Sequence, residues 1–293
     1  MTTTLALSGS PLAVTLDRVG ALSEGLTAEL GPLDAGWLPA AALLDPDSPE
    51  LAEALAQSVA RYPGAEPRVS GAFFINTYAW YMPAVAIAAY LAAGRVPDLT
   101  PENVALRYQT YTWHYGDESG ESERIDVRFL SGRFATLPND PAADHPDALI
   151  LPDAEALRDW LRTGLEAHLA PLIEAVAART HLGRRAQWTL AADDIAALFL
   201  HIGKQLGDEA RGRAEGLALI KAAASPLCNP NTSYVTVEAG GCCESFLARG
   251  GCCLYYRLHP GENCTTCVLR PAAERDQLLR DYLARKQSIE VPA

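Results

Sequence analysis

Residues 69–94 read VSGAFFINTYAWYMPAVAIAAYLAAG, a run that contains no charged side chain. A helix of this length is long enough to cross a bilayer. However, Asn76, Thr77 and several tyrosines interrupt the run, its alanines make it only weakly apolar, and the chain has no second segment of this kind. We therefore expect a buried helix, kinked or broken at Pro83, in the core of a soluble protein without stable membrane insertion.

The segments on either side of this run predict another helix and a small sheet. Upstream, SPELAEALAQSVARY begins with a serine of the N-capping type, which predicts a helix over about residues 48–61. Downstream, residues 94–115 and 123–138 change from helical spacing to alternation of apolar and polar residues, across a gap rich in glycine and acidic residues. This pattern predicts a small antiparallel hairpin or sheet.

The second half of the chain returns to helical spacing. Residues 153–224 are rich in alanine and leucine, and Pro171, Gly183 and Gly207 divide them into three or four predicted helices. Residues 271–287 have the pattern of an amphipathic helix. The expected fold class is mainly α, of the α+β type: a helical body, a small antiparallel β element and a cysteine-rich C-terminal module.

Composition indicates an ordinary globular protein, with 293 residues of which 49% are hydrophobic. The formal charge of −12 disfavours nucleic acid as a partner, because binding to phosphates requires a basic surface. From residue 228 onward acidic and basic residues are equal in number, so the acidic excess lies in the first 227 residues. This difference predicts a body over residues 1–227 and an appended module over residues 228–293.

Most of the cysteines lie in residues 240–267, GGCCESFLARGGCCLYYRLHPGENCTTC. The chain begins without a positively charged segment before its first apolar run, so we expect no secretory signal and a cytoplasmic location. In that reducing compartment, and with an odd total of 7 cysteines, metal ligands or redox groups are favoured over disulfides. Two vicinal pairs, Cys242–Cys243 and Cys252–Cys253, could each combine with the one downstream CxxC. The second pair gives the spacing CCx10CxxC. The first pair would leave a loop of twenty residues, which is longer but sterically possible.

Four thiolates could hold either zinc or an iron-sulfur cluster. Adjacent side chains of a strand point to opposite faces, so Cys252 and Cys253 converge only if the backbone turns between or before them, which Gly250 and Gly251 permit. Zinc sites usually combine two separated knuckles, so a vicinal pair favours iron-sulfur. The sequence has no dinucleotide-binding, phosphate-binding or hydrolase motif, so nucleotide-dependent and hydrolytic functions lack support.

The CCx10CxxC motif, within GGCCLYYRL and CTTCVLRP, resembles the FhuF-like siderophore-iron reductase family. The stretches PLCNP, AAYLAAGRVPDLTPENVALRY and RRAQWTLAADDIAALFL are similar to other passages of that family, so the resemblance spans much of residues 70–286. It implies a 2Fe-2S cluster, in an iron-sulfur module, with four ligands: Cys252, Cys253, Cys264 and Cys267. The chain departs from the family in Cys228, Cys242 and Cys243, which we expect to be packed or surface thiols; a second metal site, or spare ligands during cluster loading, is the alternative.

The resemblance also implies a function, an oxidoreductase that passes single electrons to cytoplasmic ferric siderophores and releases ferrous iron. Such a ferric-chelate reductase would act in iron acquisition in the cytoplasm, including the inner face of the membrane. Because the sequence lacks a flavin or nicotinamide fingerprint, we expect an external electron donor, either a ferredoxin or a flavoprotein. Two other classes of function remain open: an iron-sulfur sensor or electron-transfer adaptor, and a zinc-stapled binding module.

Further site residues can be named from their chemistry. A siderophore pocket needs aromatic and cationic groups beside the cluster, and four residues are candidates: Trp113, Arg184, Arg185 and Trp188. The alternative for the two tryptophans is packing in the fold, and the alternative for the two arginines is an ordinary surface or helix-end charge. Arg257, inside the cysteine loop, is expected to offset the negative charge of the cluster, unless it is simply solvated. We expect no catalytic residue beyond the cluster, and we expect Asp193 and Asp194 to stabilise the start of a helix.

Overall fold

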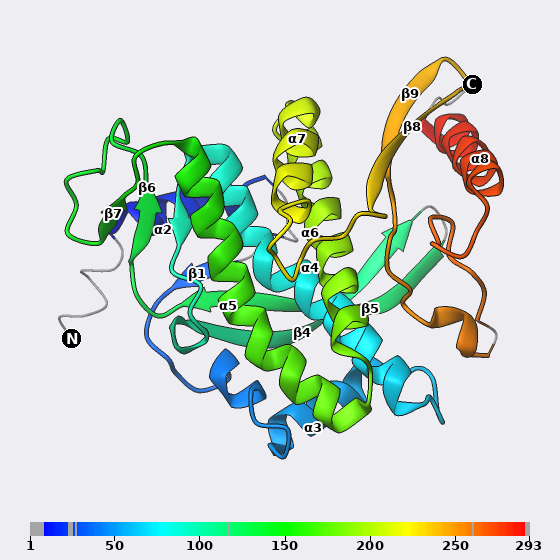
Figure 1. Cartoon of the computed structure of the whole chain (residues 1–293), viewed down its shortest axis with the longest axis horizontal. Coiled ribbons are helices and arrows are strands. Elements are labelled where there is room, and N and C mark those ends of the chain that lie inside the picture. The colour runs from blue at the N-terminus through cyan, green and yellow to red at the C-terminus, as the bar shows by residue number, and fades with distance from the viewer. Residues whose placement is uncertain (1–8, 23–25, 27, 116–117, 260, 291–293) are drawn as a thin grey trace.

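Helix α4 (Pro67–Ala93) forms the centre of the molecule, with α5 (Ala154–Thr180) and α6 (Arg184–Gln205) packed along it (Figure 1). The computed structural model describes residues 9–22, 26, 28–115, 118–259 and 261–290. By length and composition, α4 is the one described helix that could cross a membrane, but 72% of its apolar window is buried inside the protein. The expectation of a buried core helix is therefore confirmed.

The prolines inside the two long helices do not divide them. Helix α5 continues through Pro171, so the break expected there is wrong, and α4 continues through Pro83, so of the kink or break expected there the break is excluded. An interior proline costs about 3 kcal/mol. Burial of one large apolar side chain offsets much of that cost, and both helices bury such side chains on either side of their proline. The predicted breaks near Gly183 and Gly207 are confirmed, because they separate α5, α6 and α7 (Glu209–Ile220).

A long antiparallel hairpin covers one side of α4, as the alternating pattern predicted. It consists of β4 (Val104–Tyr115) and β5 (Glu118–Phe129), paired from Val104 opposite Phe129 to Tyr115 opposite Glu118. Leu106 and Val127 are fully buried on its inner face. Two short strands extend the sheet to the order β1-β5-β4-β2: β1 (Ala28–Leu30), parallel to β5, and β2 (Leu38–Pro39), antiparallel to β4.

The other elements of the body are short. The predicted helix after Ser48 is α3 (Pro49–Ser58), in which the Ser48 hydroxyl accepts a hydrogen bond from the Leu51 N–H at 3.1 Å. A second sheet joins β3 (Val96–Pro97) and β6 (Phe134–Thr136), which pair antiparallel inside the stretches predicted to form a sheet, to β7 (Ala148–Ile150). Sequence patterns did not indicate β7 or three short helices: α2 (Pro11–Gly20), η1 (Ala40–Leu43) and η2 (Pro101–Asn103).

A buried hydrogen-bonded histidine joins α4 to α5. The hydroxyl of Tyr78 lies 2.6 Å from Nε2 of His168, and Nδ1 of His168 lies 2.7 Å from the carbonyl oxygen of Leu99. Burial lowers the pKa of His168 to about 4, so the ring is neutral at physiological pH. The contact therefore stabilises the core without placing a charge in it.

The C-terminal part forms a hairpin, a long loop and a helix at one edge of the body (Figure 1). These are β8 (Ser233–Ala239), β9 (Cys242–Ala248), a loop that contains η3 (Tyr255–Arg257), and α8 (Ala272–Glu290), the predicted terminal helix. Leu279 and Leu283 of α8 pack on Val237 in a small apolar cluster separate from the main core. The fold class is confirmed; the domain boundary between residues 227 and 228 stays a prediction.

Candidate metal centre

The loop over residues 250–269 carries four cysteines and follows directly after β9. Its CxxC segment is a turn in which the Cys267 N–H donates to the Cys264 carbonyl oxygen at 3.0 Å. The Arg270 guanidinium closes over this turn and donates to the same carbonyl at 2.9 Å. The N–H of Leu269 donates to Cys267 Sγ at 3.4 Å. The turn thus holds both of its thiols near one another.

The backbone bends at Gly250 and Gly251, directly before the vicinal pair, as the sequence predicted. Leu254, the residue after Cys253, has a φ of 62°, a left-handed conformation that is uncommon for a large side chain. Neither Gly250 nor Gly251 has a positive φ, so the bend itself does not require glycine at these positions. A different constraint explains why they are glycines.

Close packing against the body leaves little room for side chains at the two glycines. A Cβ on Gly250 would lie 2.5 Å from Asn229 Oδ1, in the segment before β8, and a Cβ on Gly251 would lie 3.1 Å from the backbone nitrogen of Leu190 on α6. The absence of a Cβ lets the loop approach the segment before β8 at Gly250 and α6 at Gly251. The double glycine before Cys252 therefore sets the distance between the cysteine loop and the body.

Asp193, on α6, holds the same two glycines through hydrogen bonds to their backbone N–H groups. This fully buried carboxylate accepts hydrogen bonds from the Gly250 N–H at 2.9 Å, the Gly251 N–H at 2.8 Å and the Thr232 hydroxyl. Burial raises the pKa of Asp193, and these donors oppose the rise. Asp193 lies well inside α6, which begins at Arg184, so its expected role at a helix start is wrong. Sequence spacing carried no signal of this contact.

The thiols of the loop share one neighbourhood. Cys253 and Cys264 are joined by a side-chain hydrogen bond, and charge interactions link Cys252 and Cys264 to Cys267. The hydrogen bond from Cys264 lowers the pKa of Cys253 to about 6, against the effect of burial, and raises the pKa of Cys264. Across the described ranges, no three histidine, cysteine or acidic side chains already surround a common point as a metal site would require. The donor set fits a cluster that four thiolates hold, provided that the thiols converge when the cluster binds.

The upstream cysteines lie elsewhere. Cys242 and Cys243 are exposed at the tip of the β8–β9 hairpin, where Cys242 pairs with Ala239. Strand β9 separates them from the loop by about 20 Å, given the usual rise per residue. Cys228 precedes the hairpin, and its carbonyl oxygen accepts a hydrogen bond from Arg185 at 2.7 Å. The first vicinal pair could therefore join the CxxC turn only if the hairpin separated.

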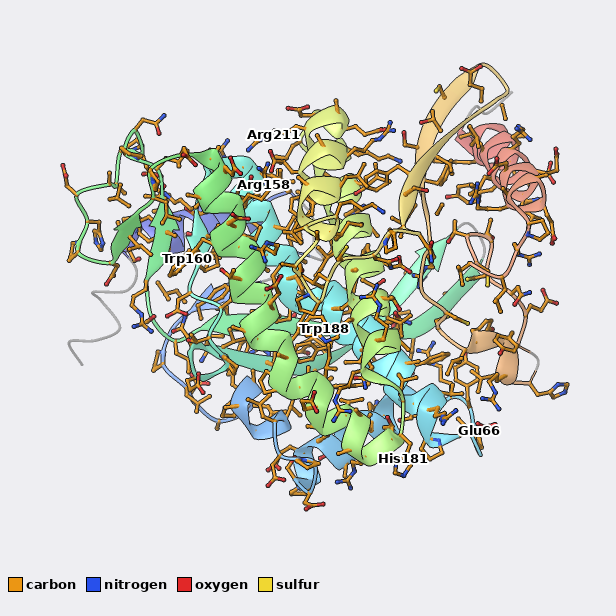
Figure 2. The ribbon with its side chains drawn as sticks, in the orientation of Figure 1. Glu66, Arg158, Trp160, His181, Trp188 and Arg211 are labelled. Atoms are coloured by element: carbon orange, nitrogen blue, oxygen red, sulfur yellow. The ribbon has the colours of Figure 1, made fainter. Side chains whose placement is uncertain are left out.

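Arg249, rather than Arg257, is the arginine whose charge acts on Cys253 and Cys264. Its charge interacts with Cys253 and Cys264, and its Nη2 lies 3.5 Å from Oδ1 of Asp194. Arg257 instead forms an ion pair with Glu66 at 2.9 Å, at the start of α4, where Figure 2 labels Glu66. The expected role of Arg257 in offsetting the negative charge of the cluster stays a prediction. The sequence analysis missed Arg249 because only the fold brings its side chain to the thiols.

Asp194 is the acidic partner of Arg249 and is almost completely buried. Burial raises the pKa of Asp194 to about 8, although Arg249 opposes the rise. Like Asp193, it lies inside α6 and not at a helix start. Its Oδ2 atom has no hydrogen-bond partner among the described residues.

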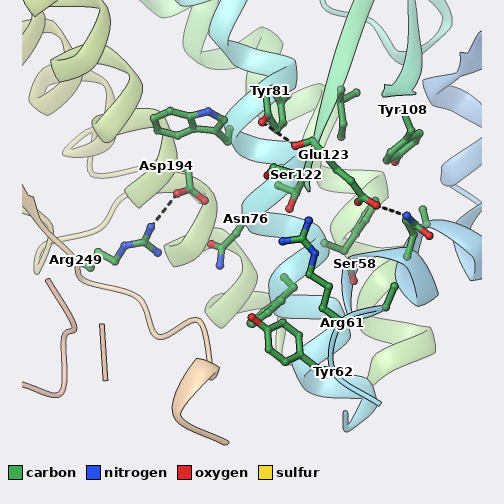
Figure 3. A pocket seen from close by; sticks show the side chains of 18 residues that line it. Ser58, Arg61, Tyr62, Asn76, Tyr81, Tyr108, Ser122, Glu123, Asp194 and Arg249 are labelled. Carbon is green, nitrogen blue, oxygen red and sulfur yellow. Dashed lines mark hydrogen bonds and ion pairs between the residues drawn. The ribbon is translucent and has the colours of Figure 1, made fainter. Parts of the chain in front are cut away.

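Two adjoining hollows lead from the sheet to the thiols. One, of about 440 Å³, lies among α3, α4 and the β4–β5 hairpin and reaches Asp194 and Arg249 (Figure 3). The other, of about 480 Å³, is lined by Cys253 and Cys264. Four residues line both hollows: Phe73, Asn76, Thr77 and Arg249. We call the first hollow the α4 cavity.

Of the residues predicted to bind substrate, the three whose side chains the structure describes do not line either of these hollows. Arg184 pairs with Glu174 at 2.6 Å on the surface, and Arg185 holds the backbone at Cys228. Trp188 is packed against the main core, on α6 (Figure 2). The side chain of Trp113 lies outside the described part of the structure. The structure thus does not bring the three described residues together with the thiols.

A family model described as ferric iron reductase FhuF-like transporter matches residues 72–241. The chain belongs to this family. A second model, the FhuF 2Fe-2S C-terminal domain, matches residues 249–269, a range that contains CCx10CxxC and excludes the first vicinal pair. No curated protein matches the chain. The chain is therefore an iron-sulfur oxidoreductase of the ferric reductase type, and its cofactor is a 2Fe-2S cluster.

Proposed function

We propose that this protein reduces cytoplasmic ferric siderophores and releases ferrous iron, and that four thiolates hold its cluster: Cys252, Cys253, Cys264 and Cys267. The cluster supplies one electron at a time when bound. The observation that carries the proposal is the continuity of the two hollows, which share Arg249 and run from a ligand-sized cavity to Cys253 and Cys264. A chelate in the α4 cavity would therefore lie beside the electron source.

The residues around the thiols have distinct roles in this proposal. Asp193 holds the backbone before Cys252 through the N–H groups of Gly250 and Gly251. Arg249 provides a positive charge between the cavity and the thiols, which favours the more negative, reduced state of the centre. Ferric iron that accepts one electron becomes the larger, less charged ferrous ion, which oxygen donors bind less strongly. Release of iron then follows from its reduction.

The proposal includes an external electron donor and a cytoplasmic location, which includes the inner face of the membrane. The sequence contains no dinucleotide-binding fingerprint, so we expect no oxidation of NADPH by the protein alone. A ferredoxin or a flavoprotein would reload the centre after each electron.

Stopped-flow mixing tests the function directly. Dithionite-reduced protein, freed of excess reductant, is mixed with ferric hydroxamate, catecholate and citrate-type chelates in the presence of a ferrous-specific chelator. Reoxidation of the centre should coincide with capture of ferrous iron for at least one class of chelate. Cys264→Ser should abolish both signals, whereas Cys242→Ser, a matched change at the hairpin tip, should preserve them. If every chelate leaves the centre reduced while a partner protein oxidises it rapidly, the protein is an adaptor and not a reductase.

A further inference from the structure

The hollow beside the thiols reaches two of the four proposed ligands. Cys253 and Cys264 line it, whereas Cys252 and Cys267 are not part of its lining. A charge interaction links Cys252 to Cys267, so these two thiols are also near one another. A chelate that occupies the hollow therefore leaves the Cys267 side of the loop for the electron donor.

Exposed apolar side chains follow directly after Cys267. Val268 is 37% exposed and Leu269 is 54% exposed, although Cys267 itself is buried. The N–H of Leu269 donates to Cys267 Sγ at 3.4 Å, so a leucine that is more than half exposed lies one hydrogen bond away from a proposed ligand. Two such side chains form a small apolar surface, which suits the limited contact of a transient electron-transfer complex better than a permanent interface.

Hydrogen bonds hold this surface in place on both sides. The Cys267 N–H donates to the Cys264 carbonyl oxygen at 3.0 Å, and the Arg270 N–H donates to the Cys267 carbonyl oxygen at 3.1 Å. The Arg270 guanidinium donates to the Cys264 carbonyl oxygen at 2.9 Å. Val268 and Leu269 lie between these anchored residues, and a segment that is already ordered loses little conformational entropy when a partner binds.

The part of the chain that carries the thiols differs in charge from the rest. From Arg249 to the C-terminus there are seven basic and five acidic residues, although the whole chain has a formal charge of −12. Arg270 and Arg275 pair with acidic residues of α8, whereas Arg280 and Arg285 are exposed and have no ion-pair partner among the described residues. An acidic partner is therefore repelled by the body and attracted to the part that carries the thiols.

Resting on the proposed function, we propose that Val268 and Leu269 form the docking site of the external electron donor, and that this donor is a small acidic protein that carries one electron at a time. The apolar pair forms the centre of the contact, and the basic groups steer the encounter. At each encounter the reduced donor loses one electron and the centre gains it. Neither Val268 nor Leu269 lines the two hollows, so donor and chelate can be bound at the same time.

Binding between oxidised proteins separates docking from electron transfer. Isothermal titration measures the Kd of an acidic plant-type 2Fe-2S ferredoxin for the cluster-loaded protein, with both proteins oxidised, at about 50 and about 300 mM NaCl. We expect the Kd to rise at least tenfold between these concentrations, because salt screens the charges that attract the partner. Absence of binding at both concentrations, or a Kd that does not change with salt, would overturn the acidic donor.

Substitutions of opposite charge at Leu269 test the place of docking and the charge of the partner. Leu269→Asp should weaken ferredoxin binding at least tenfold. Leu269→Lys should weaken it less than about threefold, since lysine keeps an apolar stem and adds a charge that attracts the partner. Val268→Asp repeats the test at the adjacent position. Leu149→Asp changes a leucine that is 44% exposed on β7, at the opposite side of the molecule (Figure 1), and should leave the affinity unchanged.

The visible spectrum verifies that each variant holds its cluster, and Val268→Asp decides if Leu269→Asp does not. Equal effects of the two Leu269 variants would overturn the acidic donor. Unchanged affinity in both aspartate variants of the surface would overturn the docking site even if ferric chelates are reduced. Ferredoxin binding that depends on Val268 and Leu269, without reduction of any chelate, would instead preserve the docking site and refute the reductase function.

Discussion

Replacing Asp193 by asparagine should destabilise the protein by about 3 kcal/mol. The carboxylate accepts the Gly250 N–H and the Thr232 hydroxyl on Oδ1 and the Gly251 N–H on Oδ2. An asparagine of the same shape has only one oxygen, so in either orientation its NH₂ group faces at least one of these donors. One unpaired buried donor costs about 1–3 kcal/mol, and the remaining bonds lose the strength that an ionised acceptor provides.

The neighbouring Asp194→Asn is the matched control. Asp194 is equally buried, but its only ion-pair distance is a long 3.5 Å to Arg249, and its Oδ2 has no partner among the described residues. Burial of this carboxylate is itself unfavourable, as its pKa of about 8 indicates, so a neutral amide should change the stability by less than about 1 kcal/mol.

Thermal unfolding measures the loss of stability, and electron paramagnetic resonance measures how firmly the cluster is retained. For a chain of 293 residues, 3 kcal/mol corresponds to a fall in Tm of about 5 °C. Asp193→Asn should also lose its reduced-cluster signal faster in the presence of an iron chelator, because the loop before Cys252 is no longer fastened to α6. Equal falls in Tm for the two variants, or an unchanged Tm in Asp193→Asn, would show that this carboxylate does not anchor the loop.

The remaining predictions concern the ligands, the potential and the pH dependence. Serine variants of each proposed ligand should lose the native visible spectrum and about two irons per chain, whereas Cys242→Ser and Cys243→Ser should retain both; loss of iron from the upstream pair alone would reverse the assignment. Arg249→Gln should lower the midpoint potential by about 60 mV, a tenfold change for one electron, because a positive charge beside Cys253 and Cys264 is lost; Arg257→Gln should change it less, and redox titration compares them. The pKa of His168 falls from an ordinary 6.5 to about 4 on folding. The neutral ring therefore contributes about 3 kcal/mol to the free energy of unfolding above pH 6.5, and this contribution is lost progressively as the pH falls toward 4. His168→Gln should flatten the dependence of Tm on pH in that window, and an unchanged slope would contradict this assignment.

Local sequence patterns were sufficient to predict the main elements of the fold. The uncharged run of α4, the alternation in β4 and β5 and the periodicity of α8 each reflect which side chains an element buries, and that information lies within a few turns or residues. Pro171 was misread as a break because the cost of a proline is local, whereas the burial that offsets it depends on neighbours far away in the chain.

The cysteine motif predicted the cofactor and the family through its resemblance to the FhuF-like proteins, and the family model confirms both; the spacing of the thiols by itself favoured iron-sulfur but left zinc open. The surroundings of the thiols could not be read in the same way. Asp193 contacts glycines 57 and 58 positions away, and Arg249 meets Asp194 across a similar separation. Arg257 was the obvious cation by sequence position, but the fold directs it to Glu66.

The sequence by itself thus predicted the long helices, the β4–β5 hairpin and the candidate cluster ligands, since each depends on residues close together in the chain; it did not predict the β8–β9 hairpin. Only the tertiary structure decided why Gly250 and Gly251 are glycines, which arginine lies beside the thiols, and where the α4 cavity forms. The physical reason is that the cavity wall combines α3, α4, β4, β5 and α6, whose relative positions follow from packing of the whole core and not from any local pattern.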